Sequence, residues 1–91
     1  MRKTYKIVDE NGFHARPAND LVMAANRFLD TEIFAEVRNR KATLHSILGV
    51  LSLHVQFGDQ FTIIANGEQE VEATRALEEA IFNLKIGELM E

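Results

Sequence analysis

The sequence predicts an α+β domain, an open-faced two-layer sandwich in which a four-stranded antiparallel sheet carries three helices on one face. Segments in which apolar and polar residues alternate, as in strands, interleave with segments whose apolar residues recur every three or four positions, as in helices. Turn-forming residues separate these segments and give the order β-α-β-β-α-β-α. The length of 91 residues allows one modest core, so residues 1–91 are expected to form a single domain.

The first two elements are expected to be a strand and a helix joined by a polar loop. Residues 4–8 alternate and contain β-forming side chains, and the turn-forming residues 9–12 follow them. Pro17 suits the first turn of a helix, so the helix is expected to begin close to it. Apolar residues at helical spacing continue as far as Phe28, and the helix is expected to end at residues 29–30.

The middle of the chain is expected to form a hairpin and a short helix. Residues 33–37 alternate as a strand, and residues 38–40 can turn the chain because asparagine tolerates positive φ. A short return strand is expected over residues 41–44. Ser46 precedes the apolar run 47–53 and serine is a favoured N-cap, which predicts a short helix there.

A strand over residues 61–65 and a helix over residues 71–84 complete the predicted order. Turns containing glycine, at residues 58–59 and 66–67, bound the strand on both sides. Acidic residues at the start of the last helix suit the positive end of its dipole.

Composition and charge exclude several classes of function. The chain has no cysteine, which rules out a disulfide framework, a thiolate metal site and a thiol nucleophile. The formal net charge of −4 disfavours general binding of nucleic acid, because such domains usually carry a basic face. Residues 1–45 carry a net charge of +2 and residues 46–91 a net charge of −6, so an anion-handling site is expected in the first half. The N-terminal residues lack the apolar length of a signal peptide or a membrane span, so we expect a cytoplasmic protein without membrane association.

The loop before the first helix carries the residues best suited to phosphoryl chemistry. His14 lies just before the predicted helix start, where unpaired backbone N–H groups and the helix dipole favour a bound anion. A neutral imidazole nitrogen is a competent nucleophile near neutral pH, and Arg16 offers a fork of donors to phosphoryl oxygens. The alternative for such a short motif is a histidine that is merely solvated in a polar loop.

Two separated motifs resemble those of the HPr family of the phosphoenolpyruvate-dependent sugar phosphotransferase system. The family pattern Gly-x-His-Ala-Arg-Pro-Ala occurs at residues 12–18, and the family segment Ser-Ile-Met-Gly-Val-Met-Ser-Leu resembles residues 46–53. The resemblance, which extends over essentially the whole chain, implies that His14 accepts a phosphoryl group on Nδ1 from phospho-enzyme I and passes it to enzyme IIA permease components. It also implies that Arg16 balances the charge of the phosphohistidine. The protein is then a phosphocarrier rather than an enzyme, and neither a cofactor nor a metal is expected.

The resemblance further implies regulation at Ser46 and a docking surface for partner proteins. Ser46 matches a serine that a dedicated HPr kinase/phosphorylase modifies in many bacteria, with a catabolite-control transcription factor as a further partner. Family members are typically monomers that form transient complexes. For the apolar positions we favour docking by Leu48 and Leu51, and we leave Ile47 open between docking and the core. The full set of expected partner-binding residues is Ala15, Pro17, Arg27, Ile47, Leu48, Gly49 and Leu51.

The chain departs from the family pattern at three places. The spacing between the active histidine and Ser46 is one residue longer than usual, and we assign the extra residue to Leu29. His45 replaces the lysine that commonly precedes the serine, which bears on recognition by the serine kinase. Residues 19–20, Asn-Asp, stand where the helix usually begins with a hydroxyl or other neutral residue, which leaves open a paralogue from the nitrogen-related branch.

Other interpretations are weaker on sequence grounds. A regulatory binding module controlled by Ser46 is the main alternative, and the retained His14 favours the carrier over it. A metal site would need His14, His45 and His54, which fall on different predicted elements without a paired spacing. A hydrolase is disfavoured because Ser46 lacks the Gly-x-Ser-x-Gly turn that such a nucleophile requires.

Overall fold

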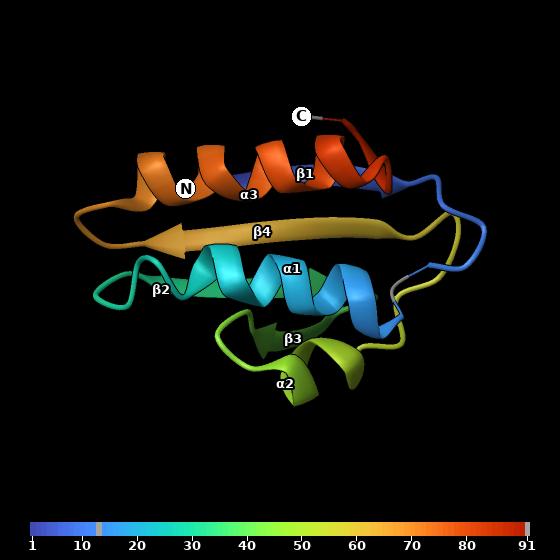
Figure 1. The fold of residues 1–91 in the computed structure, drawn as a ribbon, viewed down its shortest axis with the longest axis horizontal. Helices are drawn as coiled ribbons and strands as arrows, with labels where there is room; N and C mark the ends of the chain where they lie inside the picture. The colour runs from blue at the N-terminus through green and yellow to red at the C-terminus, as the bar shows by residue number, and fades with distance from the viewer. Residues whose placement is uncertain (13, 91) are drawn as a thin grey trace.

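The computed structural model describes residues 1–12 and 14–90, and within them it contains three helices and five strands (Figure 1). In chain order the elements are β1 (Arg2–Ile7), α1 (Ala15–Ala25), β2 (Glu32–Val37), β3 (Arg40–Thr43), α2 (Ile47–Leu51), β4 (Gln60–Asn66), α3 (Glu70–Leu84) and β5 (Gly87–Leu89).

The strands form one antiparallel sheet in the order β3-β2-β4-β1-β5. The central strand β4 pairs with β1, where Thr4 lies opposite Thr62, and with β2, where Phe34 lies opposite Ile64. Helices α1 and α3 run alongside each other over one face of the sheet, and α2 packs beside α1 at the β3 edge (Figure 1). This arrangement is the open-faced two-layer sandwich that the sequence predicts.

The strand count differs from the prediction, because the sheet has a fifth strand. β5 pairs with β1, with Tyr5 opposite Leu89 and Ile7 opposite Gly87. Three residues are too few to show the alternation that reveals a strand in a sequence. The chain can turn back onto the sheet because Lys85, which caps α3, adopts the left-handed conformation with φ of 58°.

The core lies between the sheet and the two long helices. The alternation of β2 places Ile33, Ala35 and Val37 in the core, as the sequence predicts. The largest fully buried side chains are Tyr5, Phe61, Ile7, Leu21, Ile33, Leu44, Leu53, Ile63, Leu77, Ile81, Ile86 and Val37.

Helix α1 is shorter at its C-terminal end than the predicted helix. It ends at Ala25, although the apolar spacing continues to Phe28. Phe28 is buried nevertheless, because a tight turn follows the helix and its N–H donates to the carbonyl of Ala25. A turn can therefore keep the periodicity of burial after the helix itself has ended.

The hairpin between β2 and β3 has the turn that the sequence predicts. Arg38 and Asn39 both have positive φ, 52° and 65°, which gives the strands the twist of a two-residue hairpin. Within the part of the chain that the structure describes, no helix combines the length and the apolar character needed to cross a membrane.

Candidate functional site

His14 occupies the N-cap position of α1. Its backbone is extended, with φ of −98° and ψ of −173°, and its carbonyl accepts the first helical hydrogen bond from the N–H of Ala18 at 3.2 Å. The imidazole is exposed and makes no capping hydrogen bond with the helix. The ring is therefore accessible to a partner at the point where the helix begins.

The first turn of α1 offers a favourable electrostatic setting for an anion. The N–H groups of Ala15 and Arg16 precede the first helical hydrogen bond and have no acceptor within the helix, and Pro17 has no N–H. The first turn contains no acidic residue, and Asp20 comes only in the second turn. An anion bound beside His14 would meet the positive end of the helix dipole without an opposing carboxylate in that turn.

His14 borders a shallow depression between the start of α1 and the end of α3. The depression has a volume of about 220 Å³. Arg16, like His14, is exposed there, whereas Pro17 is buried beneath them. The lining residues are Asp9, His14, Arg16, Pro17, Asn83, Leu84 and Ile86.

Gly12, in the turn after β1, lies directly on the backbone of the segment before β4. Gly12 has φ of 60°, and a Cβ at this position would overlap the carbonyl oxygen of Val55 and lie 2.9 Å from the Cα of Gln56. Only glycine fits this contact without displacing one of the two backbones. The N–H of Gly12 also donates to the carbonyl of Asp9 at 3.0 Å, which closes the turn after β1.

Ser46 is the N-cap of α2, as the sequence predicts. Its Oγ accepts a hydrogen bond from the N–H of Gly49 at 3.2 Å. A Cβ on Gly49 would lie 3.1 Å from the carbonyl oxygen of Thr43, so this glycine allows α2 to pack closely against the end of β3. The side chain of Ser46 is half-buried, and it lies at the start of a different helix from His14.

The residues expected to bind partners differ in their exposure. Leu48 is 80% exposed, whereas Ile47 and Leu51 are half-buried and pack against the core. Ala15 and Arg27 are exposed, and the Arg27 guanidinium lies over the ring of Phe28. Helix α2, which carries the exposed Leu48, packs beside α1 (Figure 1).

The other two histidines have separate environments. The ring nitrogens of His45 lie 2.8 Å from Asn26 Oδ1 and 3.0 Å from the carbonyl oxygen of Thr31, which ties the β3–α2 loop to the end of α1. His54 is exposed, with φ of 49°. Among residues 1–12 and 14–90, no three His, Cys, Asp or Glu side chains are grouped so as to hold a metal ion.

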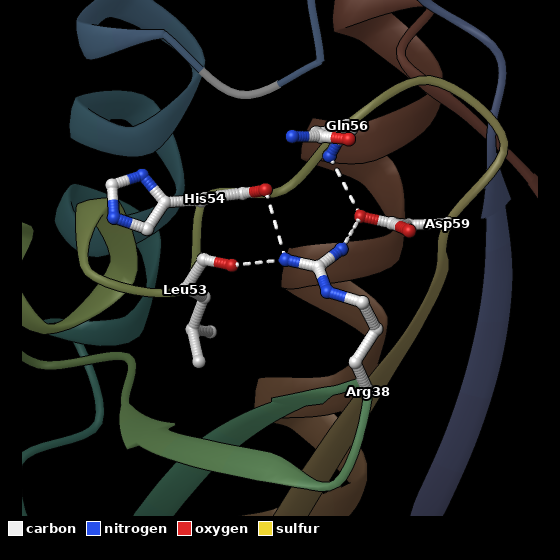
Figure 2. Close-up of polar contacts among 5 residues, drawn as sticks. All are labelled: Arg38, Leu53, His54, Gln56 and Asp59. Atoms are coloured by element: carbon white, nitrogen blue, oxygen red, sulfur yellow. Dashed lines mark hydrogen bonds and ion pairs between the residues drawn. The ribbon is translucent and has the colours of Figure 1, made fainter.

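Arg38 makes polar contacts that the sequence pattern does not predict. It is assigned only to a turn, yet its guanidinium binds the carbonyl oxygens of Leu53 and His54 and the carboxylate of Asp59 (Figure 2). The partners lie 15 to 21 residues further along the chain, so no local motif signals these contacts.

Comparison with known proteins supports the family resemblance. A family model described as the PTS HPr component phosphorylation site matches residues 1–83. The structure is similar to that of a mycoplasma histidine-containing phosphocarrier protein, with a TM-score of 0.93 and 26% identity over 97% of this chain and 99% of that chain. It is also similar to the phosphocarrier protein HPr of Bacillus anthracis, with a TM-score of 0.79 and 35% identity over 88% and 94% of the two chains. The catabolite-repression protein Crh of Bacillus subtilis, whose structure is a swapped dimer, gives a TM-score of 0.71 and 37% identity over 86% and 88%.

Proposed function

Because the chain belongs to the HPr family of phosphocarriers of the phosphotransferase system, we propose that His14 accepts a phosphoryl group from phospho-enzyme I and passes it to enzyme IIA components of sugar permeases. The observation that carries this proposal is the exposed imidazole of His14 at the N-cap of α1, where the ring has no capping role.

The chemistry requires a neutral ring nitrogen and a setting that accepts negative charge. Nδ1 of His14 attacks phosphorus with its lone pair while the proton stays on Nε2, and the N–P bond forms as the bond to the donor breaks. The free N–H groups of Ala15 and Arg16 and the exposed Arg16 guanidinium can then receive the phosphoryl oxygens. The reverse exchange delivers the group to the next protein.

HPr proteins carry the phosphoryl group between partner enzymes and are generally not catalysts themselves. An open depression of about 220 Å³ beside His14 suits this role, because a partner's active site has to close over the ring during transfer. The exposed Leu48, together with Arg27, supplies an apolar and a basic contact for docking such partners.

The proposal is tested by incubating the protein with phosphoenolpyruvate, magnesium and purified enzyme I, followed by intact-mass measurement. We expect a gain of one phosphoryl group that is acid-labile and absent from His14→Ala. Ser46→Ala is the matched control and keeps the gain. Absence of a gain in the wild type, with an enzyme I of the same organism that phosphorylates another HPr, contradicts the proposal.

Regulation through Ser46 is a second candidate function, supported by the similarity to Crh, which is described as a catabolite-repression HPr. Ser46 is half-buried, and its Oγ accepts the N–H of Gly49, so a phosphate on this oxygen would lie at the N-terminus of α2. Incubation with ATP and an HPr kinase/phosphorylase is expected to give an acid-stable phosphate that is lost in Ser46→Ala. An unmodified Ser46 under these conditions contradicts the regulatory role.

The branch of the system is a separate part of the proposal. We favour the sugar branch over a nitrogen-related paralogue because residues 46–53 resemble the segment of the sugar-branch proteins. Rates of phosphorylation by enzyme I of each branch, measured side by side, separate the two. Faster transfer from the sugar-branch enzyme supports the assignment, and faster transfer from the nitrogen-branch enzyme overturns it.

A further inference from the structure

The guanidinium of Arg38 joins three segments that are distant in the sequence (Figure 2). Its Nη2 donates to the carbonyl oxygens of Leu53 at 2.6 Å and of His54 at 3.0 Å, and its Nη1 donates to Asp59 Oδ2. Arg38 itself lies in the β2–β3 turn. One side chain therefore fixes two points of the loop between α2 and β4 to the hairpin: the segment at Leu53 and His54, and Asp59 just before β4.

The backbone of residues 53–59 is shaped to receive this side chain. His54 adopts positive φ, which allows its carbonyl and that of Leu53 to face the same nitrogen. The His54 ring points away from the guanidinium, whereas its carbonyl oxygen points toward it (Figure 2). Asp59 Oδ2 also accepts the N–H of Gln56 at 2.8 Å, so the loop is closed on itself at the same carboxylate.

The same loop supports the segment that carries His14. Gly12, two residues before His14, lies against the backbone of Val55 and Gln56 closely enough to exclude a Cβ. Val55 directly follows His54, whose carbonyl Arg38 holds. A continuous set of contacts thus runs from Arg38 through residues 53–56 to the turn that places His14 at the start of α1.

We infer that Arg38 is a positioning residue for phosphoryl transfer: its guanidinium fixes residues 53–59, and this loop holds the Gly12 turn that sets the place of His14. The inference rests on the proposed function of His14 and deepens it. Among the described residues, the hydrogen-bond partners of Arg38 are Leu53, His54 and Asp59, and Arg38 does not line the depression beside His14.

The effect of losing Arg38 is expected in the transfer step more than in docking. The exposed Leu48 lies on α2, which the buried Val50 anchors in the core and whose Gly49 packs closely against the end of β3, so the docking surface is expected to keep its place without the guanidinium. The Gly12 turn, by contrast, lies directly on the loop backbone at Val55 and Gln56. Transfer depends on alignment to within about 1 Å. In the enzyme I reaction, with this protein as the phosphoryl acceptor, kcat is therefore expected to fall on the order of tenfold while KM for the protein changes less than about twofold.

The experiment compares phosphorylation by enzyme I in the wild type, Arg38→Ala and Arg38→Lys. A lysine can pair with Asp59 but lacks the planar fork that spans the two carbonyls and the carboxylate, so Arg38→Lys is expected to have an intermediate kcat. All variants are assayed at a temperature at which circular dichroism shows them folded. Amide hydrogen exchange of Gly12, whose N–H donates to the carbonyl of Asp9, is measured in the same samples and is expected to be faster in Arg38→Ala.

Two control variants isolate the role of the guanidinium. Arg2→Ala makes the same change of charge and breaks another ion pair, between Arg2 and Glu36 at 3.0 Å, without touching the loop. His54→Gly removes the ring but keeps the carbonyl that Arg38 binds. Both controls are expected to keep the wild-type kcat and the wild-type exchange at Gly12.

The outcomes separate this inference from the proposed function. If the wild type gains no phosphate, the proposed function fails, and the exchange rates alone decide whether Arg38 positions the Gly12 turn. If the wild type is phosphorylated but Arg38→Ala matches Arg2→Ala in kcat, the positioning role is wrong. Exchange at Gly12 that is equal in Arg38→Ala and the wild type overturns it as well.

Discussion

The contact between Gly12 and the loop before β4 gives a prediction that two glycines of the chain can test together. In Gly12→Ala the new Cβ meets positive φ, which costs about 1–2 kcal/mol in an L-residue. It also overlaps the Val55 carbonyl and lies 2.9 Å from the Gln56 Cα, and forcing two backbones apart adds about 1–3 kcal/mol. The free energy of unfolding is therefore expected to fall by about 2–5 kcal/mol.

Gly58→Ala is the matched control for this prediction. Gly58 also has positive φ, 86°, but a Cβ there would have no atom within 4 Å. Both substitutions restrict the unfolded chain equally, so that contribution cancels in the comparison. Only the backbone strain of about 1–2 kcal/mol is expected in Gly58→Ala.

Urea unfolding, followed by circular dichroism, measures both variants against the wild type. The difference between them is expected to be about 1–3 kcal/mol, which corresponds to roughly 4–24 °C in melting temperature for a domain of this size. Equal losses of stability in the two variants would show that the Gly12 turn does not rest on residues 55–56, and the reasoning would be refuted.

Three further predictions concern the core, the cap and pH. Leu48→Ala is expected to lower the free energy of unfolding by less than about 0.5 kcal/mol, because Leu48 is 80% exposed. Leu53→Ala is expected to lower it by about 2–5 kcal/mol, because Leu53 is only 2% exposed. Comparable losses of the two variants in urea unfolding would contradict the assigned burial. Ser46→Ala removes the hydrogen bond to the start of α2 and is expected to cost about 1 kcal/mol in the same assay, and an unchanged midpoint would rule out the cap. Burial and the hydrogen bond to Glu78 raise the pKa of Tyr5 above its ordinary value of 10.0, so the stability from the protonated phenol is complete below that pH and is lost as pH rises above it. Tyr5→Phe is therefore expected to lose less stability between pH 9 and 11 than the wild type, and parallel losses would contradict this origin.

Local sequence patterns predicted most of the elements that place the candidate site. Pro17 indicated the start of the first helix, and Ser46 indicated the cap of the second, because both residues act on the backbone within a few positions. The alternation around Ala35 predicted a half-buried strand for the same reason. Such rules depend only on neighbours in the chain, so they hold before any tertiary contact is known.

The errors have a common physical cause, which is that distant parts of the chain decided the outcome. β5 exists because β1 offers an unpaired edge to three residues that carry no strand pattern of their own. The helix α1 ends at Ala25 although Phe28 continues its apolar spacing, because the core accepts Phe28 from a turn. A pattern of burial therefore reports which residues face the core, but not which backbone conformation presents them.

The candidate site shows the same division between local and distant information. The motif around His14 gives the proposed nucleophile and the helix N-terminus, and both can be predicted from adjacent residues. The support for that motif comes from Val55 and Arg38, which lie 41 and 24 positions after His14. Neither residue belongs to a pattern that indicates this role in the sequence. Gly12 belongs to both cases. It is part of the local motif, but only glycine fits there because of the contact with the distant Val55. A substitution of Arg38 is accordingly expected to alter the chemistry at His14 while every residue of the motif stays intact.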